Sequence, residues 1–364
     1  MVPEPITTES SADARPVKSV SVMRRRWQKF RTLKRGWYSF VFLLGAYVLT
    51  FFLPLLINNR ALVVSYQGEY YFPAFGVTYE AKTFGQRAIG EAQYRKLAAQ
   101  FEEAGGDDWV LMPPYPFHPN ESLLTDLKLP GTPPHAPSAR HWMGTDDRAR
   151  DVFARLAYGF RVSITFGLAV VTLGYLIGVV VGSALGFFGG RLDIYGQRVV
   201  EIWAGLPFLY TVMIVSSIVK PDLTVLIGIL SLFSWIGISF YMRGEFYREK
   251  AKDYVAAAIA QGEANLAVMA RHILPNSLTP VISFAPFALV GAISSLVALD
   301  FLGFGLRPPA PSWGELVNQG LGNIYEWHLV FFPLGALFAT LLMVVFIGEA
   351  IREAFDPKPY SRLR

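Results

Sequence analysis

Six long apolar segments constrain this chain more than any other feature of its sequence. A transmembrane helix needs about 20 mostly apolar residues. Segments of that kind lie at residues 37–57, 162–188, 199–219, 223–242, 277–302 and 329–351. Charged residues make up only 17% of the 364 positions, too few to cover a soluble protein of that length. The sequence therefore predicts an all-α polytopic membrane protein with six transmembrane helices.

The distribution of basic residues predicts the orientation of these helices. The N-terminal tail, 1–36, carries nine Lys or Arg, and the segments after the second, fourth and sixth apolar segments carry two, five and four. The two short loops on the other side carry one each, Lys220 and Arg307. Because cytoplasmic loops are enriched in Lys and Arg, both termini, including the tail 352–364, are predicted to be cytoplasmic. We expect no cleaved signal peptide, because 36 residues precede the first apolar segment.

The basic run in the N-terminal tail has two other interpretations. It resembles in composition a lipid-binding amphipathic arm or a nucleic-acid patch. Topology alone accounts for the run, so neither interpretation is needed and we expect no nucleic-acid partner. Contact with the lipid bilayer is expected from the transmembrane helices.

Residues 58–150 form a polar insert that is predicted to lie outside the cytoplasm. The stretch 63–77 is rich in Tyr, Phe and Val, which indicates one or two strands. Residues 91–104 have apolar positions at helical spacing and are followed by Gly105 and Gly106, which predicts an amphipathic helix. Proline-rich segments at 112–117 and 131–137 are expected to be extended. The insert is therefore expected to be a small mixed module between the first two transmembrane helices.

Three histidines of the insert raise the question of a metal site or an enzyme. His118, His135 and His141 lie near Asp146 and Asp147, but their spacing matches no metal-binding pattern. The chain has no cysteine, which excludes thiolate catalysis and Cys-based metal sites. We interpret these histidines as surface or packing residues and expect neither a metal nor catalytic residues.

Four glycines at four-residue spacing mark one face of the second apolar segment. Gly174, Gly178, Gly182 and Gly186 remove the side chain along a whole helix face, which lets another helix backbone approach closely. They predict a helix-packing interface.

Ionisable residues are placed near the ends of the predicted spans. Glu201 begins the third, while Asp300 and Glu349 lie near the ends of the fifth and sixth. An ion-coupled secondary carrier would be expected to place such groups near the midplane, so this placement weakens that alternative without excluding it. Pro207, Pro286 and Pro333 fall within spans and are expected to kink them.

The connection 243–276 between the fourth and fifth spans has the pattern of a short docking helix. Asp253 is positioned to cap a helix whose middle, residues 256–258, is three alanines, and Gly262 is positioned to end it. A second helical stretch at 266–272 leads to Leu274 and Pro275, where the chain re-enters the membrane. A short helix with a small-residue face suits a groove on another protein, although an ordinary connector helix is the alternative.

This connection resembles the EAA loop of ABC-importer permeases. Ala257 and Ala258 are followed after three residues by Gly262, after nine more by His272, and then by Leu274 and Pro275. The family pattern is E-A-A-x3-G-x9-I-x-L-P, so Ala256 stands at the glutamate position and His272 at the isoleucine position.

Other segments resemble the dipeptide and oligopeptide branch, C-type, of the same family. Outside the loop they are residues 144–163, which begin with Gly144-Thr-Asp, and residues 187–193, 301–314 and 352–357. Within the loop they are Tyr254–Ala258 and residues 271–276. The insert 58–150 is longer than in most such permeases and resembles that of Yej-type permeases, which are linked with oligopeptide and microcin C uptake.

The resemblance implies a type I ABC-importer permease fold with its core at 151–351, in a bacterial inner membrane. It implies half of a translocation pathway that pairs with a second permease, two ABC ATPase subunits or domains, and an extracytoplasmic peptide-binding protein. The partners would bind the ATP, and this chain would need no cofactor. The sequence agrees, because it contains no Gly-Lys dipeptide and hence no Walker A phosphate loop.

By the same resemblance, the helix between Asp253 and Gly262 would couple the permease to the ATPase. The expected force-bearing contacts are Ala257, Ala258 and Gly262, and Pro275 is expected to fix the exit angle. The alternatives are an ion-coupled secondary carrier and a membrane enzyme that uses the external histidines.

Overall fold

The computed structural model describes residues 22–124 and 132–356. Residues 1–21 of the predicted tail, the start of the second proline-rich segment at residue 131, and the C-terminal residues 357–364 lie outside the described residues.

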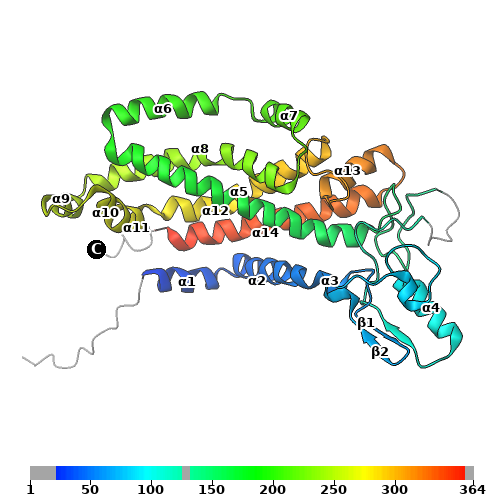
Figure 1. The fold of residues 1–364 in the computed structure, drawn as a ribbon. Coiled ribbons are helices and arrows are strands. Elements are labelled where there is room, and N and C mark those ends of the chain that lie inside the picture. The colour runs from blue at the N-terminus through cyan, green and yellow to red at the C-terminus, as the bar shows by residue number, and fades with distance from the viewer. Residues whose placement is uncertain (1–21, 125–131, 357–364) are drawn as a thin grey trace, which may run out of the picture.

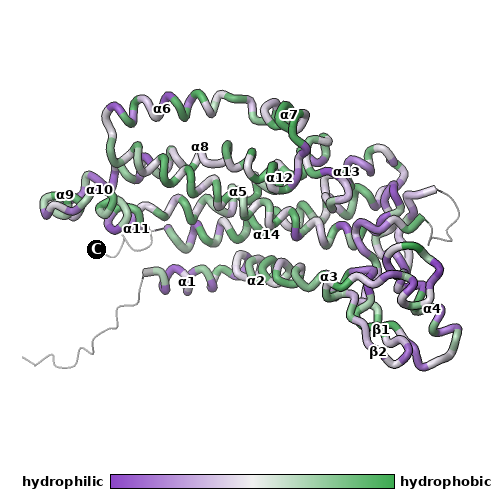
Figure 2. Tube along the Cα trace, in the orientation of Figure 1, coloured by the Kyte–Doolittle hydropathy of each residue, from purple (hydrophilic) through white to green (hydrophobic). Residues whose placement is uncertain are grey.

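Long apolar helices run side by side in one bundle (Figure 1). Five spans are long and apolar enough to cross a membrane. They are Lys34–Leu56, made of α2 (Lys34–Leu49), η1 (Thr50–Phe52) and α3 (Leu53–Leu56), then α5 (Val152–Phe188), α8 (Leu223–Lys250), α12 (Thr279–Phe301) and α14 (His328–Phe355). Their sequences are coloured mostly as hydrophobic in Figure 2, whereas the insert at one end of the bundle is largely polar.

The predicted third span at 199–219 is sharply bent, which confirms the kink expected at Pro207. This region forms α6 (Gly190–Ala204) and α7 (Phe208–Ile218), which meet at a bend of 70° and are long and apolar enough to cross a membrane only when taken together. The break coincides with Pro207, which has no N–H for a helical hydrogen bond and disfavours helical geometry in the residue before it. The bundle therefore has six spans if this bent pair counts as one.

The predicted loop between the second and third spans is also replaced by helix. Gly189 and Gly190 have φ of +62° and +56°, which lets the chain reverse within two residues, and α6 then starts at Gly190. Arg191 and Arg198 consequently lie on α6. At its other end α5 reaches back to Val152, ten residues before the predicted start of the span, and Asp151 caps it by accepting from the N–H of Ala154.

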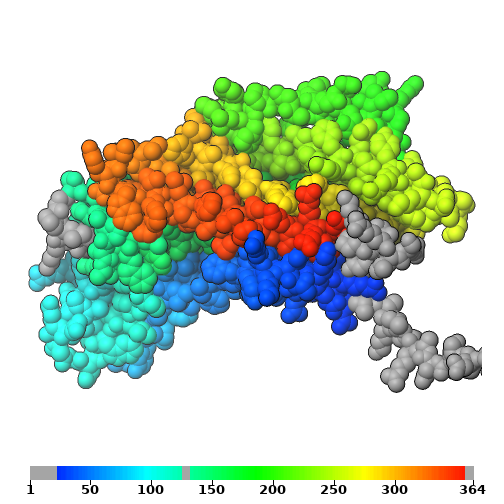
Figure 3. Space-filling view, turned by 180° about the vertical axis from the view of Figure 1, so that it is seen from behind, coloured from blue at the N-terminus to red at the C-terminus, as the bar shows by residue number. Residues whose placement is uncertain are grey.

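The described part of the N-terminal tail is a helix that packs on the bundle. α1 (Val22–Thr32) carries the basic run and buries Phe30 against Ala350 and Ala354 of α14. Arg26 lies 4.7 Å above the ring of Phe355. Figure 3 shows α1 and α2, in blue, lying along α14, in red.

The insert contains a small antiparallel sheet covered by a helix. β1 (Val63–Tyr66) lies between β2 (Glu69–Tyr71) and β3 (Trp109–Leu111), and α4 (Tyr94–Ala104) packs on one face. The predicted strands at 63–77 and the helix stopped by Gly105 are confirmed, although the helix begins three residues later than predicted. β3 was not predicted. Two short helices, η2 (Pro73–Phe75) and η3 (Ala81–Phe84), complete the module.

The connection between α8 and α12 lies at the opposite end of the bundle from the insert (Figure 1). It contains α9 (Asp253–Ala260), α10 (Asn265–Ala267), the π-helix η4 (Val268–Ile273) and α11 (Leu274–Ser277). The described ends of the chain, at α1 and at the end of α14, lie on the same side as α9. α13 (Trp313–Gly322) packs near the insert end.

Candidate functional site

α9 begins at Asp253 without a side-chain cap. Lys252 occupies the N-cap position and makes no capping hydrogen bond, so the prediction that Asp253 caps this helix is wrong by one position. As the first helical residue, Asp253 instead places a carboxylate at the positive end of the helix dipole.

α9 ends in a complete Schellman motif at Gly262. The N–H of Glu263 donates to the carbonyl of Ala258 (3.2 Å), and the N–H of Gly262 donates to the carbonyl of Ile259 (3.0 Å). Gly262 has φ of +80°, a left-handed conformation that costs other residues roughly 1–2 kcal/mol. Gly262 therefore stops α9 and turns the chain, as the sequence indicates.

The two faces of α9 differ in what they contact. Val255 and Ala258 are buried against the bundle, with 0% and 7% of their surface exposed. Ala256, Ala257 and Ala260 are exposed on the outward face. The expectation that Ala258 contacts a partner is therefore not met, because its methyl group packs between α9 and the bundle. Ala257 lies on the face that a partner would reach.

A hydrogen-bonded cluster joins the start of α9 to the end of α8 and to α11. The buried carboxylate of Glu249 accepts from Lys252 Nζ (2.7 Å) and from Tyr254 Oη (2.7 Å). Asn276 donates to Tyr254 Oη (3.3 Å) and to the carbonyl of His272 (2.8 Å). Burial and the neighbouring Glu249 raise the pKa of Tyr254, so its hydroxyl stays protonated and donates.

A second contact closes the far side of the loop. His272 Nε2 lies 2.6 Å from Glu263 Oε2, and Arg271 lies 3.7 Å from the same carboxylate. The family pattern has isoleucine at this position, whereas His272 makes a polar contact there. Leu274 packs partly into the core beneath α9, and Pro275 follows it in α11, which continues directly from η4.

An apolar core fixes this loop on the bundle. Val255, Ala258, Val268 and Ile273 pack with residues of α5 and α8, which are Phe187, Ile238, Met242 and Phe246. The loop is therefore attached to the α5 and α8 pair by both its core and its polar cluster.

α5 and α8 approach closely along the four glycines. A Cβ atom at Gly178, Gly182 or Gly186 would lie 2.5, 2.3 and 2.5 Å from backbone carbonyl oxygens of α8. At Gly174 it would lie 1.8 Å from the hydroxyl of Ser234. The structure thus places the whole glycine ladder against one neighbouring helix, where no side chain would fit without movement.

Asp193, which was not predicted as a site residue, joins the start of α6 to α8 by hydrogen bonds. The carboxylate of Asp193 accepts two bonds from Arg243 (2.5 and 2.6 Å) and one from Tyr247. Glu249 was also missed. Neither Glu249 nor Asp193 stands at a position that the EAA pattern specifies, although Asp193 is the last residue of the family-like segment 187–193.

At the insert end, four charged side chains form a buried cluster. Arg150 lies 2.7 Å from Asp146 and 3.0 Å from Glu315, and Arg155 lies 2.5 Å from Glu315. Arg155 has no exposed surface and also donates to the carbonyls of Pro119 and Ala310. The cluster joins the segment before α5, α5 itself and α13.

Asp300 has a structural role at the same end. Its carboxylate accepts from the N–H of Leu306 (2.6 Å) and the hydroxyl of Ser312 (2.5 Å), which positions the turn between α12 and α13.

The three histidines of the insert do not converge. His141 Nδ1 bonds Asp151 (2.8 Å), which also accepts from the Tyr115 hydroxyl (2.6 Å), while His118 Nδ1 accepts from the N–H of Asn120. Within residues 22–124 and 132–356, no group of three or more His, Asp or Glu side chains is arranged to hold a metal.

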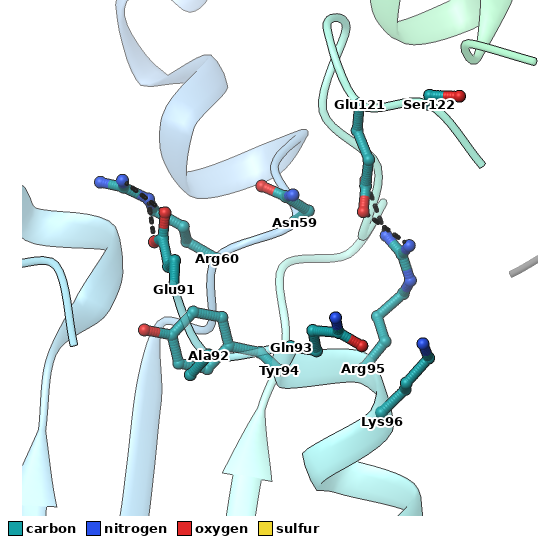
Figure 4. Close-up of a pocket in the computed structure, with 10 residues that line it drawn as sticks. All are labelled: Asn59, Arg60, Glu91, Ala92, Gln93, Tyr94, Arg95, Lys96, Glu121 and Ser122. Atoms are coloured by element: carbon teal, nitrogen blue, oxygen red, sulfur yellow. Dashed lines mark hydrogen bonds and ion pairs between the residues drawn. The ribbon is translucent and has the colours of Figure 1, made fainter. Parts of the chain in front are cut away.

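A polar cavity of about 230 Å³ lies within the insert (Figure 4). Two ion pairs line it, Arg60 with Glu91 at 2.7 Å and Arg95 with Glu121 at 2.8 Å. In each pair the side chains point toward each other, so these charges serve to hold the insert together.

Comparison with known proteins matches the chain to one family and to several relatives. A family described as "Binding-protein-dependent transport system inner membrane component" matches residues 174–359. The peptidoglycan transport system permease protein YejE of Agrobacterium fabrum is 36% identical, over 93% of this chain and 94% of the relative. The inner membrane ABC transporter permease protein YejE of Escherichia coli is 37% identical, over 92% of this chain and 97% of the relative.

Other permeases and one solved structure align with a smaller part of this chain. The dipeptide transport system permease protein DppC of Bacillus subtilis is 36% identical, over 65% of this chain and 72% of the relative. An inward-facing structure of the MetNI methionine ABC transporter is 17% identical and covers 56% of this chain and 96% of that chain, with a TM-score of 0.44.

Proposed function

Because the chain belongs to the family of binding-protein-dependent transport system inner membrane components, we propose that it forms half of the translocation pathway of an ATP-driven peptide importer. It is an inner-membrane ABC permease with several membrane spans, and its similarity to YejE proteins extends through the insert. DppC of Bacillus subtilis, by comparison, aligns with 65% of the chain. The other half of the pathway would be a second permease subunit.

We propose that the ATPase acts on the outward face of α9. The observation that carries this proposal is the arrangement of α9: Val255 and Ala258 are buried in the bundle, while the outward surface exposes three small side chains, Ala256, Ala257 and Ala260, beside the apolar Ile259. Such a helix fits a groove on a partner. The cluster around Glu249 and the core around Val255 would then carry a displacement of α9 into α8.

In this arrangement ATP would be bound by two ATPase subunits or domains, and this chain would hold no cofactor. The absence of a Gly-Lys dipeptide supports that division of labour. Both termini and α9 would face the cytoplasm, and the insert would face the binding protein, since the basic segments and the described chain ends gather at the α9 end of the bundle.

The substrate class that we propose is peptides and peptide-bearing compounds. Relatives named for dipeptide, oligopeptide and peptidoglycan transport support this class. Competition of radiolabelled oligopeptide uptake by free muropeptides and by a microcin C-type peptide nucleotide would rank these candidates. An ion-coupled carrier would keep its uptake in cells whose ATPase subunit is inactive, and we expect uptake to be lost there.

A matched pair of variants tests the role of α9. Ala257→Arg places a large cation on the outward face, so we expect loss of uptake and of substrate-stimulated ATP hydrolysis with unchanged membrane expression. Ala104→Arg makes the same change at an exposed position of α4 at the other end of the molecule and is expected to leave transport unchanged. Normal uptake by Ala257→Arg would refute the assignment of α9.

A further inference from the structure

The sheet of the insert is apolar on both of its faces. On the inner face, Val64, Tyr71 and Val110 stand opposite one another and pack into the core beneath α4. The register places Tyr70 and Trp109 together on the outer face, on either side of Ser65. An antiparallel sheet with one covered face normally presents polar residues on the other. This outer face therefore differs from that of a sheet that faces water.

Large side chains on this outer face and at the adjoining η2 expose about half of their surface or more. We name Tyr70, Phe72, Phe75, Trp109 and Leu111 the aromatic face; 64%, 47%, 66%, 45% and 49% of their surfaces are exposed. Tyr70 lies beside Trp109 and Phe72 beside Phe75, with ring centroids 6.3 Å apart in both pairs. A contiguous exposed patch of this kind marks an interaction surface.

The aromatic face adjoins the end of the first span. Ala74, between Phe72 and Phe75, donates its N–H to the carbonyl of Ala61 and shares the lining of a cavity with Pro54 of α3. Phe51 and Phe52, in η1 just before α3, are also mostly exposed. The aromatic face is therefore attached to the segment that directly follows the first span.

The position of α4 shows in which direction the aromatic face points. α4 covers the inner face of the sheet, on the side that is farther from the membrane-spanning helices (Figure 1). The outer face is directed back toward the level of the spans, where the bilayer surface lies, and not toward a soluble protein that approaches from beyond α4.

From these observations we propose that the aromatic face lies in the bilayer interface on the insert's side of the membrane and anchors the insert there. Trp and Tyr are the residues that favour this zone, because their rings are amphipathic. The occupant is the lipid surface itself. The anchor would hold the insert at the bilayer surface, in addition to the contacts that Tyr115 and Phe117 make with the start of α5.

Site-directed spin labelling of the full chain in phosphatidylethanolamine and phosphatidylglycerol nanodiscs tests this proposal. The chain has no cysteine, so Tyr70→Cys and Phe75→Cys each give one labelling site, and Glu103→Cys on exposed α4 is the matched control. We expect nitroxides at 70 and 75 to collide more with oxygen, which dissolves in lipid, than with a water-soluble nickel chelate. The order of the two collision rates should reverse at 103.

Two outcomes would overturn the proposal. One is that labels at 70 and 75 behave like the label at 103, which would place the aromatic face in water. The other is that the nickel chelate reaches 70 and 75 in nanodiscs and loses access only when the purified extracytoplasmic binding protein is added. That second result would assign the aromatic face to protein docking. All three variants alter exposed side chains, so comparable yields and melting temperatures provide the folding control.

Discussion

The glycine ladder offers the sharpest quantitative test of how α5 and α8 are held together. At Gly182 a Cβ atom would lie 2.3 Å from the backbone oxygen of Ser239 and 2.9 Å from Cβ of Met242. Neither atom can rotate away, and ordinary van der Waals contact begins at 3.4 Å. Gly182→Ala therefore forces the two helices apart by about 1 Å, and overpacking of this kind costs about 1–3 kcal/mol.

Two further variants calibrate that figure. At Gly237 of α8 nothing lies within 4 Å of the added Cβ, so Gly237→Ala keeps the gain in helix propensity, about 1 kcal/mol, without the overlap. At Gly174 the closest atom is the hydroxyl of Ser234, which can rotate, although its Cβ at 3.0 Å is tight. We expect stability to fall in the order Gly237→Ala, Gly174→Ala, Gly182→Ala.

Thermal unfolding of the purified full chain in detergent measures this order. One kcal/mol shifts the melting temperature by roughly 2–4 °C for chains of 150–250 residues, so Gly182→Ala should melt at least about 2 °C below Gly237→Ala. Equal melting temperatures for these two variants would show that the close approach of α5 and α8 contributes nothing to stability, and the packing argument would fail.

Three other predictions follow from the polar clusters and from Gly262. Tyr254→Phe removes one donor to the buried Glu249 carboxylate, a bond worth about 1.5–3 kcal/mol, and should lower uptake per ATP hydrolysed while the ATPase remains bound. Gly262→Ala should weaken uptake because the left-handed φ of +80° costs about 1–2 kcal/mol, whereas Gly262→Asn should retain most of it. Glu315→Gln removes the main countercharge of the buried Arg155 and should destabilise the chain by about 3–5 kcal/mol. The matched change at an exposed ion pair, Glu201→Gln, should cost less than about 1 kcal/mol. Thermal unfolding measures both effects.

Each of these three predictions has an outcome that would contradict it. Unchanged uptake per ATP in Tyr254→Phe would show that the cluster around Glu249 transmits no force. Equal activity of the Ala and Asn variants at position 262 would show that the backbone conformation is not the constraint. Similar melting temperatures for Glu315→Gln and Glu201→Gln would mean that water solvates the buried cluster.

The sequence was sufficient for elements that depend on long patterns. Apolar runs of about 20 residues predicted the spans, because a lipid-exposed helix must be apolar on nearly all sides. The break at 205–207 was only partly predictable. Pro207 signals a kink, but the angle of 70° depends on how α7 packs beyond it.

Finer features of the site depend on tertiary contacts. Residues 256, 257 and 258 are all alanine, so their identity cannot show which of them faces the bundle. The signal that was available is Val255, an apolar residue three positions before Ala258 and hence on the same helix face. The sheet was ambiguous for a related reason. Tyr70 and Tyr71 point to opposite faces, and because both are aromatic, no alternation distinguishes inside from outside.

The contacts described above limit where a displacement of α9 can be absorbed. Glu249 belongs to α8 and binds Tyr254 of α9, so the helix and its support move together on the proposed mechanism. α8 is in turn closely packed on α5, whose 37 residues span about 55 Å at 1.5 Å per residue. At the far end Arg155 joins α5 to Glu315 of α13. On the proposed mechanism, these contacts would carry a displacement of α9 through α8 and α5 to α13 at the insert end.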